Sequence, residues 1–142
     1  REAADRMKPT PDAVPEEMLN AIVAQYPGKA VFIDCWATWC VPCMKGIEAM
    51  EPMKERMKGL DAVFVYLTNE TSQMDAWSEQ VIRIPGQHYR IKSDIWNKIP
   101  GLGAIPQYYL YDRQGKRVWE TTGFGKETLK EIETEINRVL EQ

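Results

Sequence analysis

The chain has 142 residues, 44% of them hydrophobic and 27% charged, which is typical of one folded domain and argues against a disordered chain. The net charge is −3 and no basic stripe is present, so we expect no nucleic-acid partner. No apolar run approaches the roughly 20 residues that a membrane-spanning helix needs.

Residues 1–14 are polar and include two prolines, which favours a tail or linker and places the folded domain at residues 15–142. Apolar periodicity then predicts, in chain order, a helix over 15–26, a strand over 30–36, a helix over 41–58 and a strand over 62–67. The first strand should be buried on both faces, because Val31-Phe32-Ile33 is a continuous apolar run. Pro52 should kink the second helix.

The second half of the chain continues the alternation of helices and strands. Ser72-x-x-Asp75 has the form of a capping box and predicts a helix over about 72–80. There follow a weaker strand over 87–91, a short helix over 93–99, a strand over 107–111, a hairpin turn over 112–115, a strand over 117–121 and a helix over 126–141. This order predicts an α/β fold with a largely parallel sheet, helices on both faces and an antiparallel hairpin at the end.

The three cysteines, Cys35, Cys40 and Cys43, all lie within nine consecutive positions. This clustering argues against a disulfide scaffold, in which cysteines are spread along the chain. Structural zinc usually needs four Cys or His ligands, and the sequence offers only one C-x-x-C pair. The pair Cys40 and Cys43 therefore favours redox chemistry, and we expect no metal site.

The C-x-x-C motif directly follows a predicted strand and opens a predicted helix. Unpaired N–H groups and the partial positive charge at a helix N-terminus stabilise a thiolate. Cys40 lies at this junction, and Cys43 lies one turn inside the helix. We therefore expect Cys40 to be exposed and to attack a disulfide, and Cys43 to be recessed and to resolve the mixed disulfide.

Residues 34–43 read Asp34-Cys35-Trp36-Ala37-Thr38-Trp39-Cys40-Val41-Pro42-Cys43. This segment resembles the active site of thioredoxins, and Trp-Ala-Thr-Trp-Cys-x-Pro-Cys resembles the TlpA/ResA-type bacterial thiol–disulfide oxidoreductases. The resemblance covers about residues 15–141. It implies a thioredoxin-like fold, with a central mixed β-sheet flanked by helices on both faces and an extra helix and strand over about 72–91. It implies no cofactor, because the two sulfurs carry the electrons.

Ile105-Pro106 matches the cis-proline loop of this family, which faces the active site. We therefore expect a cis bond before Pro106, with the Ile105 backbone beside Cys40, where an extended substrate could pair with it. Trp39 should shield the sulfurs and offer an apolar contact. The residues expected to bind substrate are Trp39, Val41, Pro42, Ile105 and Pro106.

Asp34 lies in a strand that otherwise reads as buried. In the family, a carboxylate at the matching position lies beneath the resolving cysteine and accepts a proton. Burial raises the pKa of a carboxyl group, which suits Asp34 to this role, although capping of a backbone group is a structural alternative. Thioredoxins often carry a lysine on the following strand, but residues 62–67 are uncharged. The pKa of Asp34 is then expected to depend on desolvation and hydrogen bonds alone.

Two further residues could carry chemistry. Cys35 is expected to be a buried, inert thiol, and a second redox site is the alternative. His88 is the only histidine and could bind copper together with the cysteines, as in copper-carrying relatives of this fold. Those relatives have three residues between the cysteines, so a structural histidine near a strand edge is favoured.

These features predict a protein disulfide oxidoreductase, with reduction as the expected direction. A disulfide-oxidising member of the same fold, a thioredoxin-like binding module and a metallochaperone with little turnover stay open as alternatives. The expected partners are protein disulfides or dithiols and a membrane thiol electron donor. The resemblance implies a location outside the bacterial cytoplasm, in the periplasm, with a membrane tether in a removed segment before Arg1.

Overall fold

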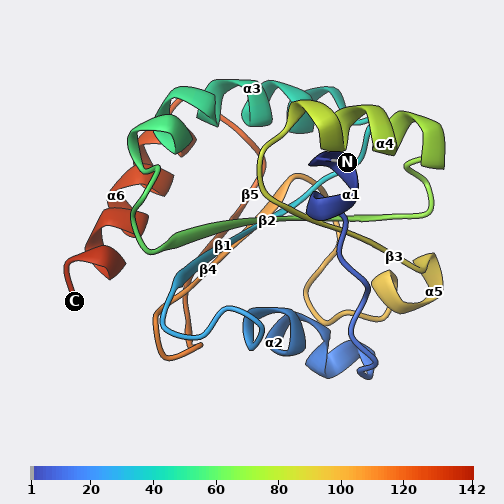
Figure 1. The fold of residues 1–142 in the computed structure, drawn as a ribbon, viewed down its shortest axis with the longest axis horizontal. Coiled ribbons are helices and arrows are strands. Elements are labelled where there is room, and N and C mark those ends of the chain that lie inside the picture. The colour runs from blue at the N-terminus through green and yellow to red at the C-terminus, as the bar shows by residue number, and fades with distance from the viewer. Residues whose placement is uncertain (1) are drawn as a thin grey trace.

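The computed structural model describes residues 2–142 and is built around a five-stranded sheet of order β3-β2-β1-β4-β5 (Figure 1). The strands are β1 (Ala30–Cys35), β2 (Ala62–Asn69), β3 (Gln87–Ile91), β4 (Gln107–Tyr111) and β5 (Arg117–Thr122). β1, β2 and β3 run parallel, whereas β4 pairs antiparallel with both β1 and β5. The predicted mixed sheet with an antiparallel hairpin at its end is confirmed.

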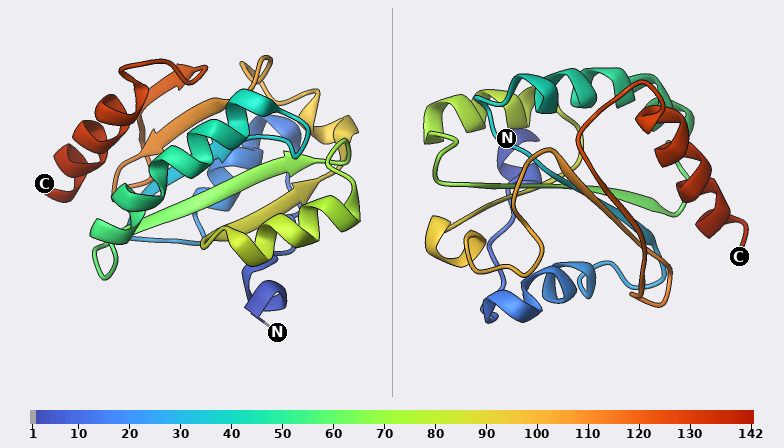
Figure 2. Two further views of the ribbon diagram at one scale, coloured as in Figure 1. Left: turned by 90° about the horizontal axis from the view of Figure 1, so that it is seen from above. Right: turned by 180° about the vertical axis from the view of Figure 1, so that it is seen from behind.

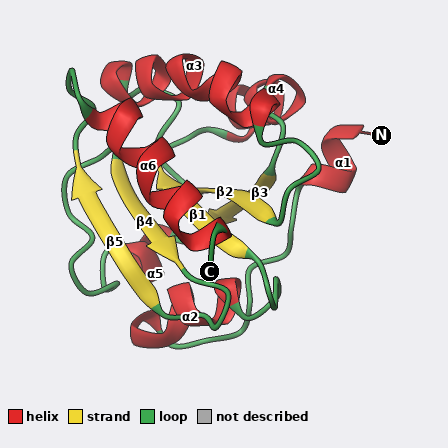
Figure 3. Cartoon of the chain, turned by 90° about the vertical axis from the view of Figure 1, so that its left-hand side faces the viewer, coloured by secondary structure: helices red, strands yellow, loops and turns green. Residues whose placement is uncertain are grey.

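Helices cover both faces of this sheet, as predicted. The helical elements are α1 (Glu2–Arg6), the 3₁₀ turn η1 (Pro15–Glu17), α2 (Met18–Val23), α3 (Val41–Arg56), α4 (Met74–Arg83), α5 (Ser93–Trp96) and α6 (Thr128–Leu140). Helices α3, α4 and α6 lie on one face, and α2 and α5 lie on the other (Figures 2 and 3). The extra helix and strand expected over 72–91 are α4 and β3, and β3 forms the edge of the sheet beside β2.

Strand β1 is buried along its whole length, which confirms the expectation from its apolar run. Val31, Ile33 and Cys35 pack in the core on the α2 side. Ala30 and Phe32 pack instead with the buried methionines of α3 and the apolar face of α6. Because side chains alternate along a strand, Asp34 points to the same side as Phe32, beneath α3.

Some predicted boundaries differ from the observed ones. The helix expected over 15–26 is divided into η1 and α2 and ends at Val23, and the one expected over 93–99 is the single turn α5. Pro52 lies inside α3, which continues to Arg56, and the kink stays a prediction.

Residues before the predicted domain boundary contact the domain. Helix α1 lies beside α4, and Met7 forms a parallel bridge with His88. The Lys8 N–H donates to the His88 carbonyl over 2.8 Å. The boundary at residue 15 stays a prediction. Within residues 2–142, no helix combines the length and apolar character needed to cross a membrane.

Candidate active site

Cys40 and Cys43 form a disulfide at the N-terminus of α3, with their Cα atoms 5.2 Å apart. Cys40 is the N-cap residue, and its Sγ accepts a hydrogen bond from the Cys43 backbone N–H over 3.3 Å. Cys40 keeps 5% of its surface exposed, whereas Cys43 has none. The prediction that Cys40 is exposed is therefore wrong for the disulfide form: both cysteines are buried at the N-terminus of α3, and Cys40 keeps only slightly more exposed surface than Cys43.

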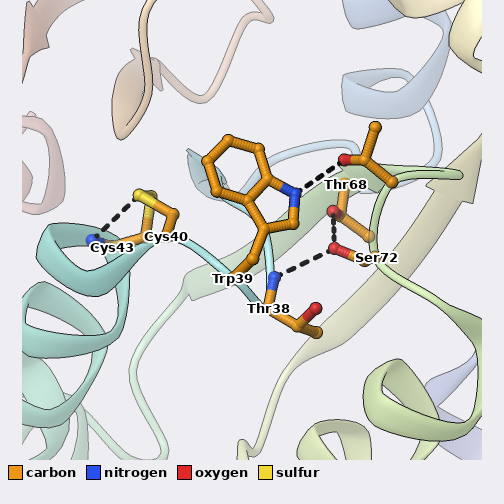
Figure 4. The surroundings of a disulfide bond; sticks show 7 residues. Thr38, Trp39, Cys40, Cys43, Thr68 and Ser72 are labelled. Carbon is orange, nitrogen blue, oxygen red and sulfur yellow. Dashed lines mark hydrogen bonds between the residues drawn. A yellow bond between two sulfur atoms is a disulfide. The ribbon is translucent and has the colours of Figure 1, made fainter.

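The segment between β2 and α4 holds the loop that leads into the disulfide (Figure 4). The Thr38 N–H donates to Ser72 Oγ over 3.0 Å, and Ser72 Oγ lies 2.7 Å from the Thr68 hydroxyl. The Trp39 Nε1–H donates to Thr71 Oγ1 over 2.9 Å. Two successive residues of the loop are therefore tied to residues more than thirty positions away.

The capping box predicted for Ser72 and Asp75 is wrong. The N-cap of α4 is Gln73, and no side chain caps this helix. The Ser72 hydroxyl is fully buried and bonds to Thr38 and Thr68 instead. The buried Ser72 hydroxyl and the Thr38 N–H both need hydrogen-bond partners. The bond between them satisfies both groups, which stabilises the protein more than a single cap on α4 would.

Three of the expected substrate-binding residues are neighbours of the cysteines in sequence and are exposed. The surfaces of Trp39 and Val41 are 60% and 64% exposed, and Pro42 is also exposed. Trp39 therefore offers a large apolar surface. Its indole N–H, which donates to Thr71, points away from the disulfide, as the view of Trp39 beside Cys40 and Cys43 shows (Figure 4).

The loop before β4 reaches the same place. The Ile105–Pro106 peptide bond is cis, as predicted. Ile105 is half-buried and packs against the apolar cluster that contains Cys40 and Cys43. Pro106 is buried, and its carbonyl accepts the Gly123 N–H over 2.8 Å. The fold thus brings Ile105 to the cysteines, more than sixty positions away in sequence.

Asp34 is fully buried, and neither of its carboxyl oxygens has a hydrogen-bond partner among the described residues. Burial raises the pKa of Asp34 to about 8, and the positive charge of Lys54 opposes this rise. The capping alternative for Asp34 is therefore excluded by its lack of hydrogen bonds within residues 2–142. A buried carboxyl group without hydrogen bonds takes up protons near neutral pH, which is what a proton acceptor for a thiol requires.

The expectation that desolvation and hydrogen bonds alone set the pKa of Asp34 is wrong, because Lys54 of α3 acts on it. The strand after β1, where thioredoxins often carry such a lysine, has none over residues 62–67. A signal was available: Lys54 follows Ile47 and Met50 by seven and four positions, on the apolar face of the helix. A lysine on such a face is buried, or nearly so, and needs a partner.

Cys35 and His88 are both buried. The Cys35 thiol is free and lies on the α2 side of the sheet, and burial, with the nearby Asp34, raises its pKa. His88 Nε2 lies 2.7 Å from the Ile84 carbonyl, and burial lowers the pKa of His88 to about 4. No group of three or more His, Cys, Asp or Glu side chains among residues 2–142 is arranged to hold a metal ion.

Several relatives of this chain are named as thiol–disulfide oxidoreductases or thioredoxin-like proteins. The Redoxin family matches residues 8–136. The thiol–disulfide oxidoreductase ResA of Bacillus thuringiensis (strain Al Hakam) is 26% identical over 79% of this chain and 64% of its own length. The thioredoxin-like protein YneN of Bacillus subtilis (strain 168) is 30% identical over 78% of this chain and 65% of its own length.

The chain thus spans just under two thirds of the length of these relatives. Among solved structures, a candidate thiol:disulfide interchange protein DsbE from Chlorobium tepidum has a TM-score of 0.68 and 25% identity, covering 83% of this chain and 84% of that one. The thioredoxin-like fold is therefore confirmed.

Proposed function

The chain belongs to the Redoxin family and is a TlpA/ResA-type thioredoxin-like protein, and on this basis we propose that it reduces protein disulfides through Cys40 and Cys43. The observation that carries the proposal is the placement of the pair. Cys40 caps helix α3 and keeps a small exposed surface, whereas Cys43, in the first turn of the helix, is fully buried. ResA, a relative along most of this chain, is named as a thiol–disulfide oxidoreductase.

The first step belongs to Cys40. In the reduced protein, its thiolate is stabilised by the N-terminus of α3 and by the Cys43 N–H. Cys40 Sγ attacks one sulfur of a substrate disulfide, and a mixed disulfide forms. The other substrate sulfur leaves as a thiolate and takes a proton from water.

The second step belongs to Cys43. Its thiol gives its proton to the Asp34 carboxylate, and Cys43 Sγ attacks Cys40 Sγ. The bond between Cys40 and the substrate breaks, the remaining substrate sulfur leaves as a thiolate, and the Cys40–Cys43 disulfide is formed. Two electrons have passed from the pair to the substrate. A dithiol protein, for which we propose a membrane thiol donor, then restores the reduced pair by the reverse exchange.

Substrate contacts come from the exposed rim of the site. Trp39, Val41 and Pro42 would contact apolar side chains of an extended substrate segment. The backbone at Ile105, with Pro106 behind it, would pair with the main chain of that segment. We also propose a periplasmic location with a tether upstream of this domain, in keeping with the resemblance to TlpA/ResA-type proteins.

Insulin reduction by dithiothreitol, followed by turbidity, tests the activity. The protein should accelerate precipitation, Cys40→Ala should abolish the acceleration, and Cys35→Ala, which removes a buried thiol outside the pair, should retain it. A flat trace for the unaltered protein would contradict the proposal. A reduction potential above about −150 mV, in the range of strong oxidants, would replace reduction by disulfide formation as the direction.

A further inference from the structure

Residues 2–8, which we call the N-terminal strap, dock onto the unit formed by α4 and β3. Among the described helices and strands, α1 makes the most extensive backbone contact with α4. Met7 forms a parallel bridge with His88 of β3, and the Lys8 N–H donates to the His88 carbonyl over 2.8 Å. Because β3 is an edge strand, the strap covers part of its open side.

Arg6 of the strap binds the C-terminal end of α4. Its Nη1 donates to the Val81 carbonyl over 2.9 Å and to the Ile82 carbonyl over 2.7 Å. Carbonyls in the last turn of a helix have no partner within the helix, and a cation there also interacts favourably with the helix dipole. The residue after α4 is Ile84 and not a glycine, and no side chain caps the other end. Arg6 therefore supplies, from 75 positions away, a cap that the sequence of the helix lacks.

The apolar face of α4 belongs to the same cluster as the cysteines. Trp77 and Val81 of α4 are buried in one cluster with Cys40 and Cys43, and Met7 of the strap packs against this cluster. The strap therefore holds α4 in two ways, by polar bonds at the end of the helix and by an apolar contact with the cluster to which the helix contributes.

The other end of α4 begins beside the active-site loop. Gln73 is the N-cap of the helix, and the two residues before it bind the loop. Ser72 Oγ accepts the Thr38 N–H over 3.0 Å, and Thr71 Oγ1 accepts the Trp39 indole N–H over 2.9 Å (Figure 4). Ser72 is fully buried, so water can replace it as the partner of the Thr38 N–H only after the loop opens. Helix α4 thus connects two attachments, the strap at its C-terminal end and the active-site loop at its N-terminal end.

We propose that Arg6 is a positioning residue for thiol–disulfide exchange: by capping α4, it holds the start of that helix against Thr38 and Trp39. The idea rests on the proposed function, in which Trp39 contacts the protein substrate. A short helix and an edge strand open locally, as one unit, more readily than the centre of a sheet. Without Arg6, this opening becomes more frequent, and the two bonds to the active-site loop break with it. The substrate then meets a less ordered Trp39.

Hydrogen exchange of the Thr38 amide, followed by NMR in the disulfide form, is the direct test. In the unaltered protein this amide should exchange faster than the amides of β1, which marks a local opening. Arg6→Met removes the donors and the charge, so exchange at Thr38 and along α4 should accelerate by the same factor, about tenfold. Arg6→Lys should restore most of the protection. Arg83→Met removes an exposed arginine from the last turn of the same helix and should leave the rates unchanged.

Two exchange results would overturn the proposal. One is a Thr38 rate in Arg6→Met no higher than in Arg83→Met, which would show that the loop opens independently of the strap. The other is equal exchange at Thr38 and in β1 of the unaltered protein, which would show that only global unfolding exposes the loop. Met7→Ala, which keeps the bonds of Arg6, should accelerate Thr38 by a smaller factor. If Arg6→Met does not fold, an unchanged rate in Met7→Ala would itself contradict the proposal.

Kinetics separate positioning from a general structural defect. In Arg6→Met the KM for insulin should rise severalfold with little change in kcat, and Arg6→Lys should restore it. Reduction of hydroxyethyl disulfide, which is too small to reach from Cys40 to Trp39 and beyond, should stay unchanged, and an equal loss with both substrates would contradict the role of Arg6. Because the exchange experiment needs no turnover, a protein that fails to reduce insulin would contradict the proposed function alone, whereas unmoved exchange at Thr38 would contradict the role of Arg6 alone.

Discussion

Cys40 caps the helix that buries Cys43: the Cys43 backbone N–H donates to Cys40 Sγ over 3.3 Å. The same N–H remains available to a Cys40 thiolate once the disulfide is reduced. A charged acceptor strengthens such a bond, and on this ground we propose that Cys40 is the attacking sulfur. The proposed order of the two steps thus rests on where the helix begins.

We predict that Thr71→Val loosens Trp39 without loss of stability. The substitution keeps the shape of an exposed side chain and removes the acceptor of the Trp39 indole N–H. Stability should change by less than about 1 kcal/mol. The KM for a protein disulfide should rise severalfold, whereas the reaction with a small disulfide should be unaffected. Thr134→Val, an exposed change on α6, is the matched control, and equal KM values for the two variants would rule out a role for Thr71.

We predict that the protein loses stability as the pH rises towards 8 because Asp34 is buried, and that Asp34→Asn removes this loss. Folded Asp34 keeps its proton until about pH 8, whereas the unfolded chain releases it near 3.8, so stability falls as pH rises between these values. His88 acts in the opposite direction, because its pKa falls from 6.5 to about 4 on folding and stability then rises with pH up to 6.5. Between pH 6.5 and pH 8, the change of stability with pH therefore comes from Asp34.

Across that window, the free energy of unfolding of the disulfide form should fall by about 2 kcal/mol, at about 1.4 kcal/mol for each pH unit. Guanidinium unfolding at several pH values measures it. Asp34→Asn should give a flat profile, and Asp75→Asn, which alters an exposed carboxylate, should keep the slope. Equal slopes in the protein and in Asp34→Asn would show that Asp34 is not the group responsible.

We predict that Gly46→Ala destabilises the protein by about 1–3 kcal/mol, because a Cβ at this position would lie 2.6 Å from the Tyr108 hydroxyl and 3.1 Å from the Phe124 ring. Tyr108 cannot move easily, since it is fully buried and its ring is stacked on Phe32. Tyr108→Phe removes a buried hydroxyl that has no partner among residues 2–142, and in the double variant it should restore part of the stability. Urea unfolding of the two single variants and the double variant measures the coupling. A Gly46→Ala protein as stable as Lys45→Ala, an exposed neighbour, would contradict the prediction.

Much of the fold follows from local sequence. The apolar runs of β1 and β2 and the turn between β4 and β5 are signals within a few residues, and each strand lies within two residues of its predicted bounds. The short helices were less well predicted, because α2 and α5 are defined by packing and turns more than by periodicity. The cis bond before Pro106 was expected from its motif and is confirmed.

The site was predictable where its chemistry is local and not where it depends on distant contacts. The place of Cys40 and Cys43 at a strand–helix junction could be predicted from local sequence, and their roles stay a prediction. The bond from Thr38 to Ser72 spans 34 positions, and nothing near Ser72 signals it, so a capping role was the natural interpretation. Lys54 acts on Asp34 from twenty positions away, through a helix that folds back over β1. No residue of the neighbouring strand indicates this lysine.

The most direct test of the account is to trap the mixed disulfide. Cys43→Ala removes the resolving sulfur, so it should hold substrate proteins covalently on Cys40, and mass spectrometry of the adducts should identify that sulfur. The double variant Cys35→Ala, Cys43→Ala should trap them equally well, and Cys40→Ala should trap none. Adducts on Cys35, or trapping that persists in Cys40→Ala, would contradict the assignment of Cys40 as the attacking residue.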